Sequence, residues 1–328
     1  MDHTQQVTMI VHDHLVRSNH PYRKILAMLD FTKLCRSIQR YNKEIEANRG
    51  YGIKTLFKCI LLQFMENLSD RELERFLQEN NAAKYFCGFS LEEKTPHFTL
   101  FSKVRERIGT NRLSKLFSKV RDGFKRQGYL PEIFTFIDAS HLISKNTLWK
   151  ERDEAIAKKY EKLNNEVLPK VAVDKQARIG CKKKNKYWYG YKKHVSVDMQ
   201  TGLINKVAVT PANITDAQGL SHVCPSQGAV HGDKGYCMSP ATREIARRGC
   251  HDATIKRNNM KGKNKDKDRW FSHLRSPYER VFSKQQRRVR YRGVCKNQFS
   301  EFFNALCFNI KRLMVLSGGN APPVFQVF

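Results

Sequence analysis

The sequence predicts an α/β protein, in which a mixed five-stranded sheet with helices follows an all-helical N-terminal domain. Three observations predict it: helical periodicity up to residue 127, a compact β-forming run at residues 133–137, and an alternation of strand and helix patterns after that run. A chain of 328 residues also exceeds the usual single-domain range. We therefore predict a helical domain over residues 1–128, an α/β domain over 129–317 and a tail over 318–328.

The first domain shows helix patterns with clear start and stop signals. Apolar residues recur at three- and four-residue spacing between Leu56 and Leu68. Ser69-Asp-Arg-Glu72 has the sequence of a capping box, and Thr95-Pro96 is a second start signal. We expect the helix that follows to stop at Gly109 and a further helix to run to Gly128. Short helices with projecting basic residues favour a helix-turn-helix-like DNA-binding region, with a plain helical bundle as the alternative.

Charge and cysteine content limit the class of protein. The net charge is +29, which exceeds what solubility requires and indicates a polyanionic partner, most readily nucleic acid. The nine cysteines include no C-x-x-C pair, which argues for free thiols in a reducing cytoplasm and against structural zinc. We expect no signal peptide and no membrane span, because the start of the chain is acidic and no apolar run is long enough. A phosphate-binding G-x-x-x-x-G-K-[ST] loop is absent, so no nucleotide cofactor is expected.

The α/β domain begins with a predicted buried strand that ends at Asp138. Residues 145–186 form a charged insertion, and residues 258–272 form a basic linker. The remaining predicted elements are, in order, a hairpin (residues 189–209), a helix (215–222), a strand (228–233), a helix (239–248), a short strand (252–256), a helix from residue 276 onward and a last helix (299–313). This order places the first strand in the middle of the sheet with the fourth strand beside it. Asp138 and Asp233 would then be neighbours, with Glu279 on a helix that packs across the same edge.

The stretch from Arg275 to Lys296 is strongly basic, and Glu279 is its only carboxylate. Such a segment is expected to bind a polyanion through its phosphates. The candidate DNA-binding residues are Lys182, Lys183, Lys184, Arg280, Lys284, Arg287, Arg288, Arg290, Arg292 and Lys296. Trp188, Tyr189 and Tyr191 are weaker candidates for stacking on bases, since aromatic residues in a strand are usually part of the core.

Three carboxylates suit two-metal phosphodiester chemistry. Two Mg²⁺ or Mn²⁺ ions about 3.5–4 Å apart would activate an oxygen nucleophile and stabilise the leaving oxygen. Our assignment has Asp138 bridging both ions and Asp233 and Glu279 each completing one. Structural alternatives remain open for each residue: a strand end for Asp138, a turn for Asp233, and a capping box at Ser276-Pro-Tyr-Glu279.

Five segments resemble bacterial insertion-sequence transposases of the DDE type, in the insertion-sequence five-like group. They are SDRELERFL with TPHFTLFSKVRERIG, FIDAS, YGYKKHVSVDMQTGLI with TPANITDA, GDKGY, and RSPYERVFSKQQRRVRYRGVCKN. The resemblance implies a ribonuclease-H-like catalytic domain, Mg²⁺ dependence, and Asp138, Asp233 and Glu279 as the catalytic triad. The sequence departs from the wider signature at two positions, where Ser272 replaces a tyrosine and Gln286 replaces a lysine.

The expected function is that of a transposase acting on double-stranded DNA in the bacterial nucleoid. It would bind the terminal inverted repeats of its element, cut at the ends and join the 3′-hydroxyls to target DNA, as a homodimer that holds two ends together. The alternatives are an inactivated transposase kept as a DNA-binding regulator, and a ribonuclease-H-like nuclease without strand transfer. A structural RNA-binding protein would explain the charge but not the ordered acidic motifs.

Overall fold

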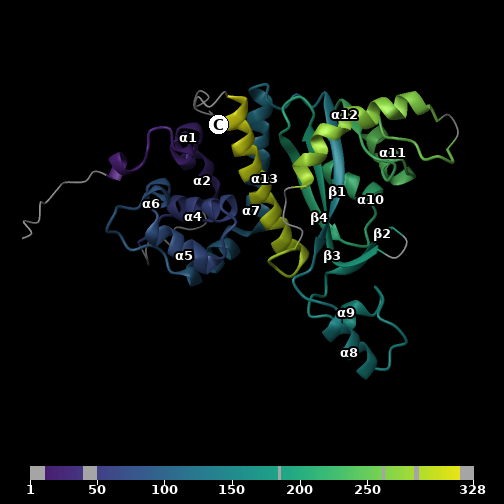
Figure 1. Ribbon diagram of the computed structural model, residues 1–328, viewed down its shortest axis with the longest axis horizontal. Coiled ribbons are helices and arrows are strands. Elements are labelled where there is room, and N and C mark those ends of the chain that lie inside the picture. Colours follow the sequence, from purple (N-terminus) through teal and green to yellow (C-terminus); the bar gives the residue numbers. More distant parts are fainter. Residues whose placement is uncertain (1–11, 40–49, 184–185, 261–262, 284–287, 318–328) are drawn as a thin grey trace, which may run out of the picture. The chain divides into compact units, whose positions relative to one another are not determined.

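The structure is a computed structural model, which describes residues 12–39, 50–183, 186–260, 263–283 and 288–317. The chain divides into two compact units (Figure 1), one formed by Met1–Gly123 with Ile310–Phe328 and the other by Phe124–Asn309. The boundaries between the two units fall within two long helices, α7 and α13, whose bounds are given below. The assignment of domains to residues 1–128, 129–317 and 318–328 stays a prediction.

The first unit is helical throughout its described part, as predicted. It begins with a 3-10 turn at His12–Leu15, and its helices are α1 (Pro21–Met28), α2 (Phe31–Gln39), α4 (Ile53–Met65), α5 (Asp70–Glu79), α6 (Asn81–Cys87) and most of α7 (Phe98–Arg126). Helix α4 supplies the centre of the core, because Leu56, Phe57, Ile60 and Leu61 are at most 1% exposed. The apolar residues whose spacing predicted this helix are therefore the residues that it buries in the core.

One helix start in this unit is confirmed and another is wrong. The Ser69 side chain accepts from the Glu72 amide, and the Glu72 carboxylate accepts from the Ser69 amide, so the predicted capping box is present. Helix α7 begins at Phe98 rather than at Thr95-Pro96. The predicted stop at Gly109 is confirmed, because its φ of 66° and ψ of 156° are non-helical and divide α7 into two helical segments. The glycine allows this local break, and the helical path resumes beyond it.

The second unit is built on a six-stranded mixed sheet. The strands are β1 (Phe134–Ile143), β2 (Arg178–Lys183), β3 (Lys186–Asp198), β4 (Ile204–Pro211), β5 (Ala229–His231) and β6 (His251–Asp252). Their order is β2-β3-β1-β5-β6, and β4 also pairs with β3. The five predicted strands and the central place of β1 are confirmed, and β1 pairs antiparallel with β3 and parallel with β5. The architecture is that of a ribonuclease-H-like fold.

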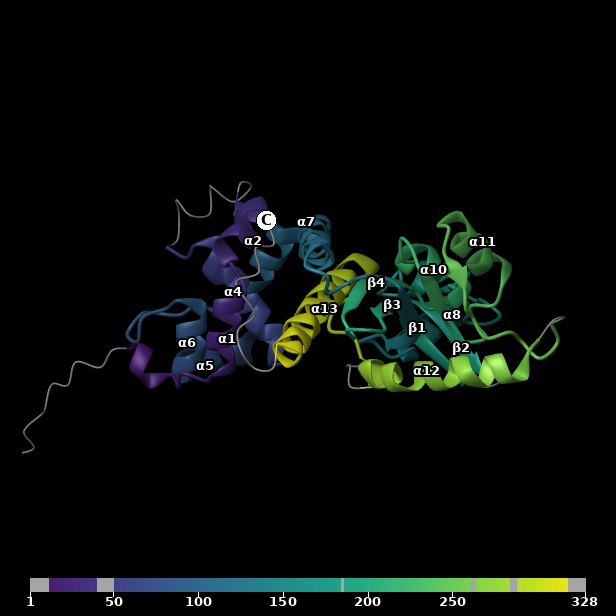
Figure 2. The ribbon, with the colours of Figure 1, turned by 90° about the horizontal axis from the view of Figure 1, so that it is seen from above.

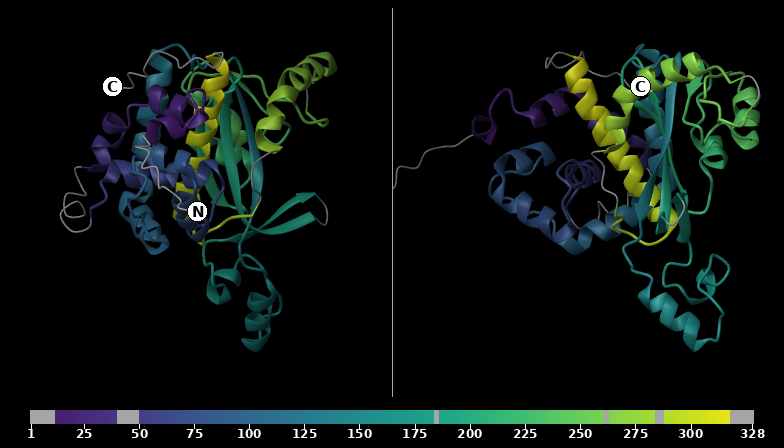
Figure 3. Two further views of the ribbon diagram at one scale, coloured as in Figure 1. Left: turned by 60° about the vertical axis from the view of Figure 1, so that its left-hand side comes forward. Right: turned by 45° about the vertical axis from the view of Figure 1, so that its right-hand side comes forward.

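The sixth strand, β2, falls inside the segment that the sequence analysis assigned to the charged insertion. Ile179 and Cys181 pair with β3, and this pairing extends the sheet into a ribbon that projects from it (Figure 3). The rest of the insertion forms a small lobe with α8 (Trp149–Ala157) and α9 (Leu168–Val171), seen beyond the end of the sheet in Figures 1 and 3. The sequence of β2, Arg-Ile-Gly-Cys-Lys-Lys, has only isolated apolar residues, so a search for apolar runs does not find the strand.

Helices cover both faces of the sheet (Figure 2). On one face lie α10 (Asp216–Val223) and α11 (Ser239–Arg247), whose Leu220 and Ile245 share a buried cluster with Ile137 and Val230. On the other lies α12 (Lys265–Ser283), whose Phe271 ring is 5.2 Å from that of His231. Helix α13 (Val294–Leu316) follows, and within the second unit the side chain of its Asn309 bonds both backbone groups of Ile204.

The start of α12 corrects two predictions. Residues 265–269, expected to be part of a basic linker, form the first turns of the helix. The side chain of Asn264 accepts from the amides of Asp266 and Lys267, which caps the helix at this earlier point. Ser276-Pro277 therefore lies inside α12 and does not begin a helix, so the capping-box alternative for Glu279 is wrong.

Candidate active site

Asp138 lies on β1, and Asp233 lies two residues beyond the end of the neighbouring strand β5. In the parallel pairing of β1 with β5, Phe136 is the partner of His231, and each acid follows two residues after that pair. Neighbouring strands lie about 4.8 Å apart, and residues two apart point to the same face. The β1–β5 register therefore brings these two acids together.

Asp138 faces the side of the sheet on which α12 lies. Asp138 has the parity of Phe136, whose ring is 6.4 Å from that of Tyr278 on α12. The hydroxyl of Tyr278 also donates a hydrogen bond to the carbonyl oxygen of Met199, which ties the helix to the end of β3. Glu279 is the next residue along α12, so its backbone lies over the same face as Asp138. The side chain of Glu279 is outside the described part of the chain.

Local hydrogen bonds orient both sheet carboxylates. The Ala139 amide donates to Oδ1 of Asp138 at 2.8 Å, and the Gly235 amide donates to Oδ1 of Asp233 at 2.8 Å. Asp233 is thus a turn residue as well as a neighbour of Asp138, so the two interpretations of it are compatible. The expectation that β1 ends at Asp138 is wrong, because pairing with β3 continues as far as Ile143.

A fourth acid, Asp216, adjoins Asp233 and was not singled out from the sequence. Its Oδ1 lies 2.8 Å from the ammonium nitrogen of Lys192 on β3. A β-carbon placed on Gly235 would lie 2.9 Å from Oδ1 of Asp233 and 3.3 Å from Oδ2 of Asp216, so the two carboxylates flank this glycine. The segment TPANITDA contained the signal, but it was interpreted only as the start of α10, which Thr215 does cap.

The side chain of Tyr236 is fully buried next to these acids. Burial raises the pKa of its hydroxyl well above the ordinary value, and the negative charges of Asp216, Asp138 and Asp233 raise that pKa further. The hydroxyl makes no hydrogen bond to any described residue. Tyr236 therefore has a buried, neutral hydroxyl that is not hydrogen-bonded to any described residue and that the charges of these three acids keep protonated.

The basic residues after Glu279 run along the end of the strand that carries Asp138. Arg288 forms a parallel bridge with Ile143, and the Val289 amide donates to the Ile143 carbonyl oxygen at 2.9 Å. Lys182, Arg288, Arg292 and Lys296 are exposed, and Arg290 is half-buried. The side chains of Lys183 and Arg280, and the whole of Lys184, Lys284 and Arg287, lie outside the described residues.

Two of the three aromatic residues proposed to stack on bases lie in the core. Tyr189 and Tyr191 are buried, and their hydroxyls donate to the carbonyl oxygen and the carboxylate of Asp174. Trp188 is half-buried, and its Nε1 donates to the Tyr191 carbonyl oxygen. The suggestion that Tyr189 and Tyr191 contact bases is therefore wrong, and these side chains belong to the core.

The donor set near the acids consists of carboxylate and hydroxyl oxygens, which suit hard divalent cations such as Mg²⁺. Among the described side chains, no three of His, Cys, Asp and Glu are grouped so as to hold a metal ion by themselves. Any cation bound by Asp138 and Asp233 would need further ligands from Glu279, from nucleic acid or from water. The chemistry of the donors fits the expected ion.

Comparison with known families identifies the family of the chain. Residues 134–310 match the family described as Transposase DDE domain, and residues 10–107 match that described as Transposase domain (DUF772). The first match covers more than half of the chain and contains Asp138, Asp233 and Glu279. This chain belongs to the DDE transposase family, as the resemblance implied. No solved structure matches it. In the described residues, no helix has the length and apolar character needed to cross a membrane.

Proposed function

We propose that this transposase is active: that it binds the terminal inverted repeats of its own element, cuts the DNA at the ends and transfers the 3′-hydroxyls to target DNA. The observation that supports the proposal is the β1–β5 register: the turn that holds Asp233 follows the strand paired with β1, and α12 lies on the side of the sheet that Asp138 faces. An acidic centre at this place would act on a phosphodiester held by the basic residues around it.

In the proposed reaction a water oxygen attacks phosphorus and the bond to the 3′ oxygen breaks, which leaves a free 3′-hydroxyl. That hydroxyl then attacks a phosphorus of the target, a new P–O bond forms, and the displaced 3′ oxygen leaves. Neither step passes through a covalent bond to the protein. Asp138, Asp233 and Glu279 would hold Mg²⁺ or Mn²⁺, which when bound stabilises negative charge on the attacking and leaving oxygens.

The remaining residues would position DNA. Lys182, Arg288, Arg292 and Lys296 are exposed and would contact phosphates, as would the other basic residues proposed from the sequence. Because Val289 is tied to the end of β1, contacts from this segment would hold a phosphate near the strand that bears Asp138. Two element ends must be cut in a coordinated way, so we propose that a homodimer holds both.

The test is cleavage of a plasmid that carries the element's ends, with the variants Asp138→Asn, Asp233→Asn and Glu279→Gln. Each variant removes one negative charge at nearly constant shape, so we expect cleavage to be lost while end binding is retained. Asp153→Asn, an exposed acid on α8, is the matched control and should cut normally. Full cleavage by any of the three would remove that residue from the centre. Pre-cut ends and a target plasmid then distinguish a transposase, which gives joined product, from a nuclease, which does not.

A further inference from the structure

We propose that Asp216 and Tyr236 are positioning residues of the acidic centre, and that they hydrogen-bond to the water molecules of a divalent cation held by Asp233. The inference rests on the proposed function, because it assumes a cation at Asp233. It assigns a role in the proposed function to two residues other than the three acids, Asp216 and Tyr236. It also assigns to Lys192 the role of fixing the side chain of Asp216. Its basis is the arrangement of these side chains around Gly235.

The two oxygens of Asp216 have different surroundings. Oδ1 is held by the Lys192 ammonium at 2.8 Å, in a site where only 12% of the lysine side chain is exposed. Oδ2 lies on the side of Gly235, where the Asp233 carboxylate also lies. Lys192 thus fixes the rotamer of Asp216 and leaves the second oxygen directed towards Asp233. It also offsets the repulsion that a further carboxylate would add to the centre.

The unpaired hydroxyl of Tyr236 is the second observation. A buried hydroxyl without a hydrogen bond costs about 1–3 kcal/mol, so one that lies among carboxylates indicates a missing partner. The hydroxyl forms no direct hydrogen bond to these carboxylates. A water molecule that is shared with Asp233 or Asp216 would satisfy it. The structure therefore points to bound water at this place.

A hydrated divalent cation supplies such water in a fixed arrangement. Magnesium keeps several of its water molecules in protein sites, and groups that hydrogen-bond to the ligands of a metal tune its affinity. Asp216 would accept hydrogen bonds from such water, and the neutral Tyr236 hydroxyl would donate or accept one. Asp233 would then hold the ion, while Asp216 and Tyr236 would hold its hydration.

A plain structural role is the competing explanation for Asp216. It is the first residue of α10, where an acidic side chain stabilises the helix N-terminus by about 0.3–1 kcal/mol. That role affects the free energy of unfolding but not the binding of a cation. For Tyr236, loss of an unpaired buried hydroxyl should leave the stability unchanged or raise it. Direct measurement of cation binding therefore separates the two roles.

The experiment measures Mn²⁺ binding to the full-length chain without DNA, from the electron paramagnetic resonance signal of free Mn²⁺. We expect Asp216→Asn and Tyr236→Phe each to weaken binding about 10- to 100-fold. Thermal unfolding is recorded for each variant, and Asp266→Asn, an exposed acid in the first turn of α12, is the control for the helix-terminus effect. The control should bind Mn²⁺ as the wild-type chain does.

Wild-type affinity in both Asp216→Asn and Tyr236→Phe, with binding lost in Asp233→Asn, would overturn this inference and leave the proposed function intact. No binding by the wild-type chain, or equal binding by wild type, Asp138→Asn and Asp233→Asn, would instead contradict the proposed acidic centre. The Tyr236→Phe variant loses only one oxygen atom from a buried ring, so we expect it to fold. It therefore still tests the inference if Asp216→Asn lowers stability.

Discussion

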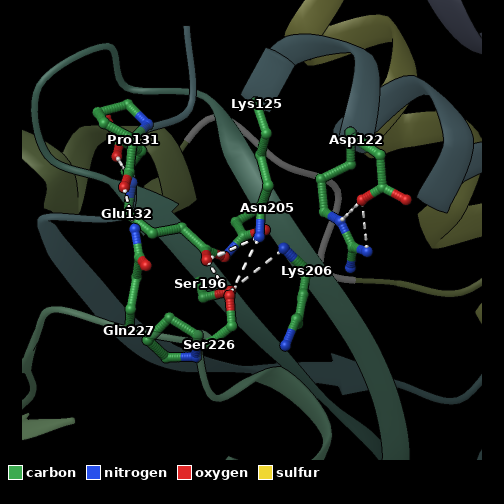
Figure 4. A network of polar contacts seen from close by, with 12 residues as sticks. Asp122, Lys125, Pro131, Glu132, Ser196, Asn205, Lys206, Ser226 and Gln227 are labelled. Carbon is green, nitrogen blue, oxygen red and sulfur yellow. Dashed lines mark hydrogen bonds and ion pairs between the residues drawn. The ribbon is translucent and has the colours of Figure 1, made fainter. Parts of the chain in front are cut away.

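The ammonium nitrogen of Lys125 lies 2.7 Å from Oε2 of Glu132, directly before the start of β1 (Figure 4). Ser226 donates to the same carboxylate oxygen and Asn205 donates to the other, so segments far apart in the sequence meet at one side chain. Glu132 is 1% exposed and has a φ of 53°, which non-glycine residues rarely adopt. This network fixes the chain directly before β1, the strand that bears Asp138.

We predict that Lys125→Met destabilises the protein by about 3–5 kcal/mol, because it leaves the Glu132 carboxylate buried without its cation. The double variant Lys125→Met/Glu132→Gln should recover much of the loss, since the neutral amide needs no counter-charge. Urea unfolding of both variants gives the two values. Equal stability of the single and the double variant would mean that the charge of Glu132 is not the cause.

The same network should weaken in acid. Burial alone would raise the pKa of Glu132, but the hydrogen bonds from Lys125 and Ser226 outweigh it and lower that pKa below its ordinary value. A carboxylate with a depressed folded-state pKa stabilises the fold above its unfolded pKa, and this contribution is lost as the pH falls through the folded value. We expect the free energy of unfolding of the Glu132→Gln variant to lack this dependence on pH. The measurement covers pH 5 to pH 2, a range of about three units around the ordinary pKa of a glutamate.

The buried side chain of His194 should give the stability of the protein a second pH dependence, at higher pH. Burial lowers the pKa of this histidine to about 4, although the charge of Asp216 acts in the opposite direction. The unfolded chain therefore binds a proton that the folded chain does not, and stability falls as the pH drops from about 6.5 towards about 4. His194→Gln should reduce the slope there by up to about 1.4 kcal/mol per pH unit. His97→Gln, at an exposed position, is the control, and an equal slope in both variants would contradict the prediction.

Gly228 sets the approach of β5 to β1. A β-carbon there would overlap the carbonyl oxygens of Glu132 and Ile133, and the φ is +79°. Gly228→Ala should therefore destabilise by about 3 kcal/mol or more, since it adds a backbone clash to the strain of a positive φ. Gly249→Ala is the matched control: its φ is +67° but no atom lies within 4 Å, so we expect a loss of about 1 kcal/mol. Similar losses in chemical denaturation would show that the close approach is unimportant.

Arg292 is predicted to bind a DNA phosphate. Arg292→Ala should weaken binding to different DNA sequences by a similar factor and reduce the slope of log affinity against log salt by about one. Arg243→Ala removes an equal charge from the exposed side of α11 and should leave the slope unchanged. Fluorescence anisotropy at several salt concentrations gives both slopes, and identical slopes in the two variants would rule out a phosphate contact by Arg292.

Strand order was predictable because β1, β5 and the hairpin have strong local patterns and obey simple connection rules. That order was enough to bring Asp138 beside Asp233. The ends of elements were less predictable. Helix α12 starts eleven residues before Ser276, where the sequence analysis expected it to start. The side chain of Asn264 caps it and Phe271 is buried, and both effects depend on tertiary structure.

Asp216 escaped prediction for a related reason. Its sequence neighbours account for it as the first residue of a capped helix, so nothing local suggests a second role. The contact with Lys192 joins residues 24 positions apart, and the approach to Asp233 depends on a glycine in a different loop. Only the folded chain shows that these groups adjoin. In the same way, nothing in the sequence near Lys125 and Glu132 indicates that Asn205 and Ser226 hydrogen-bond to the Glu132 carboxylate in the folded chain.

The three acids differ in how they are attached. Asp138 and Asp233 are fixed by the pairing of β1 with β5, whereas Glu279 is carried by a helix that rests on the sheet through Phe271 and Tyr278. Detaching that helix would separate the third acid from the other two without breaking a strand pair. Under the proposed function, catalytic competence is then separable from resistance to unfolding, because a change under α12 would remove the first while sparing the second.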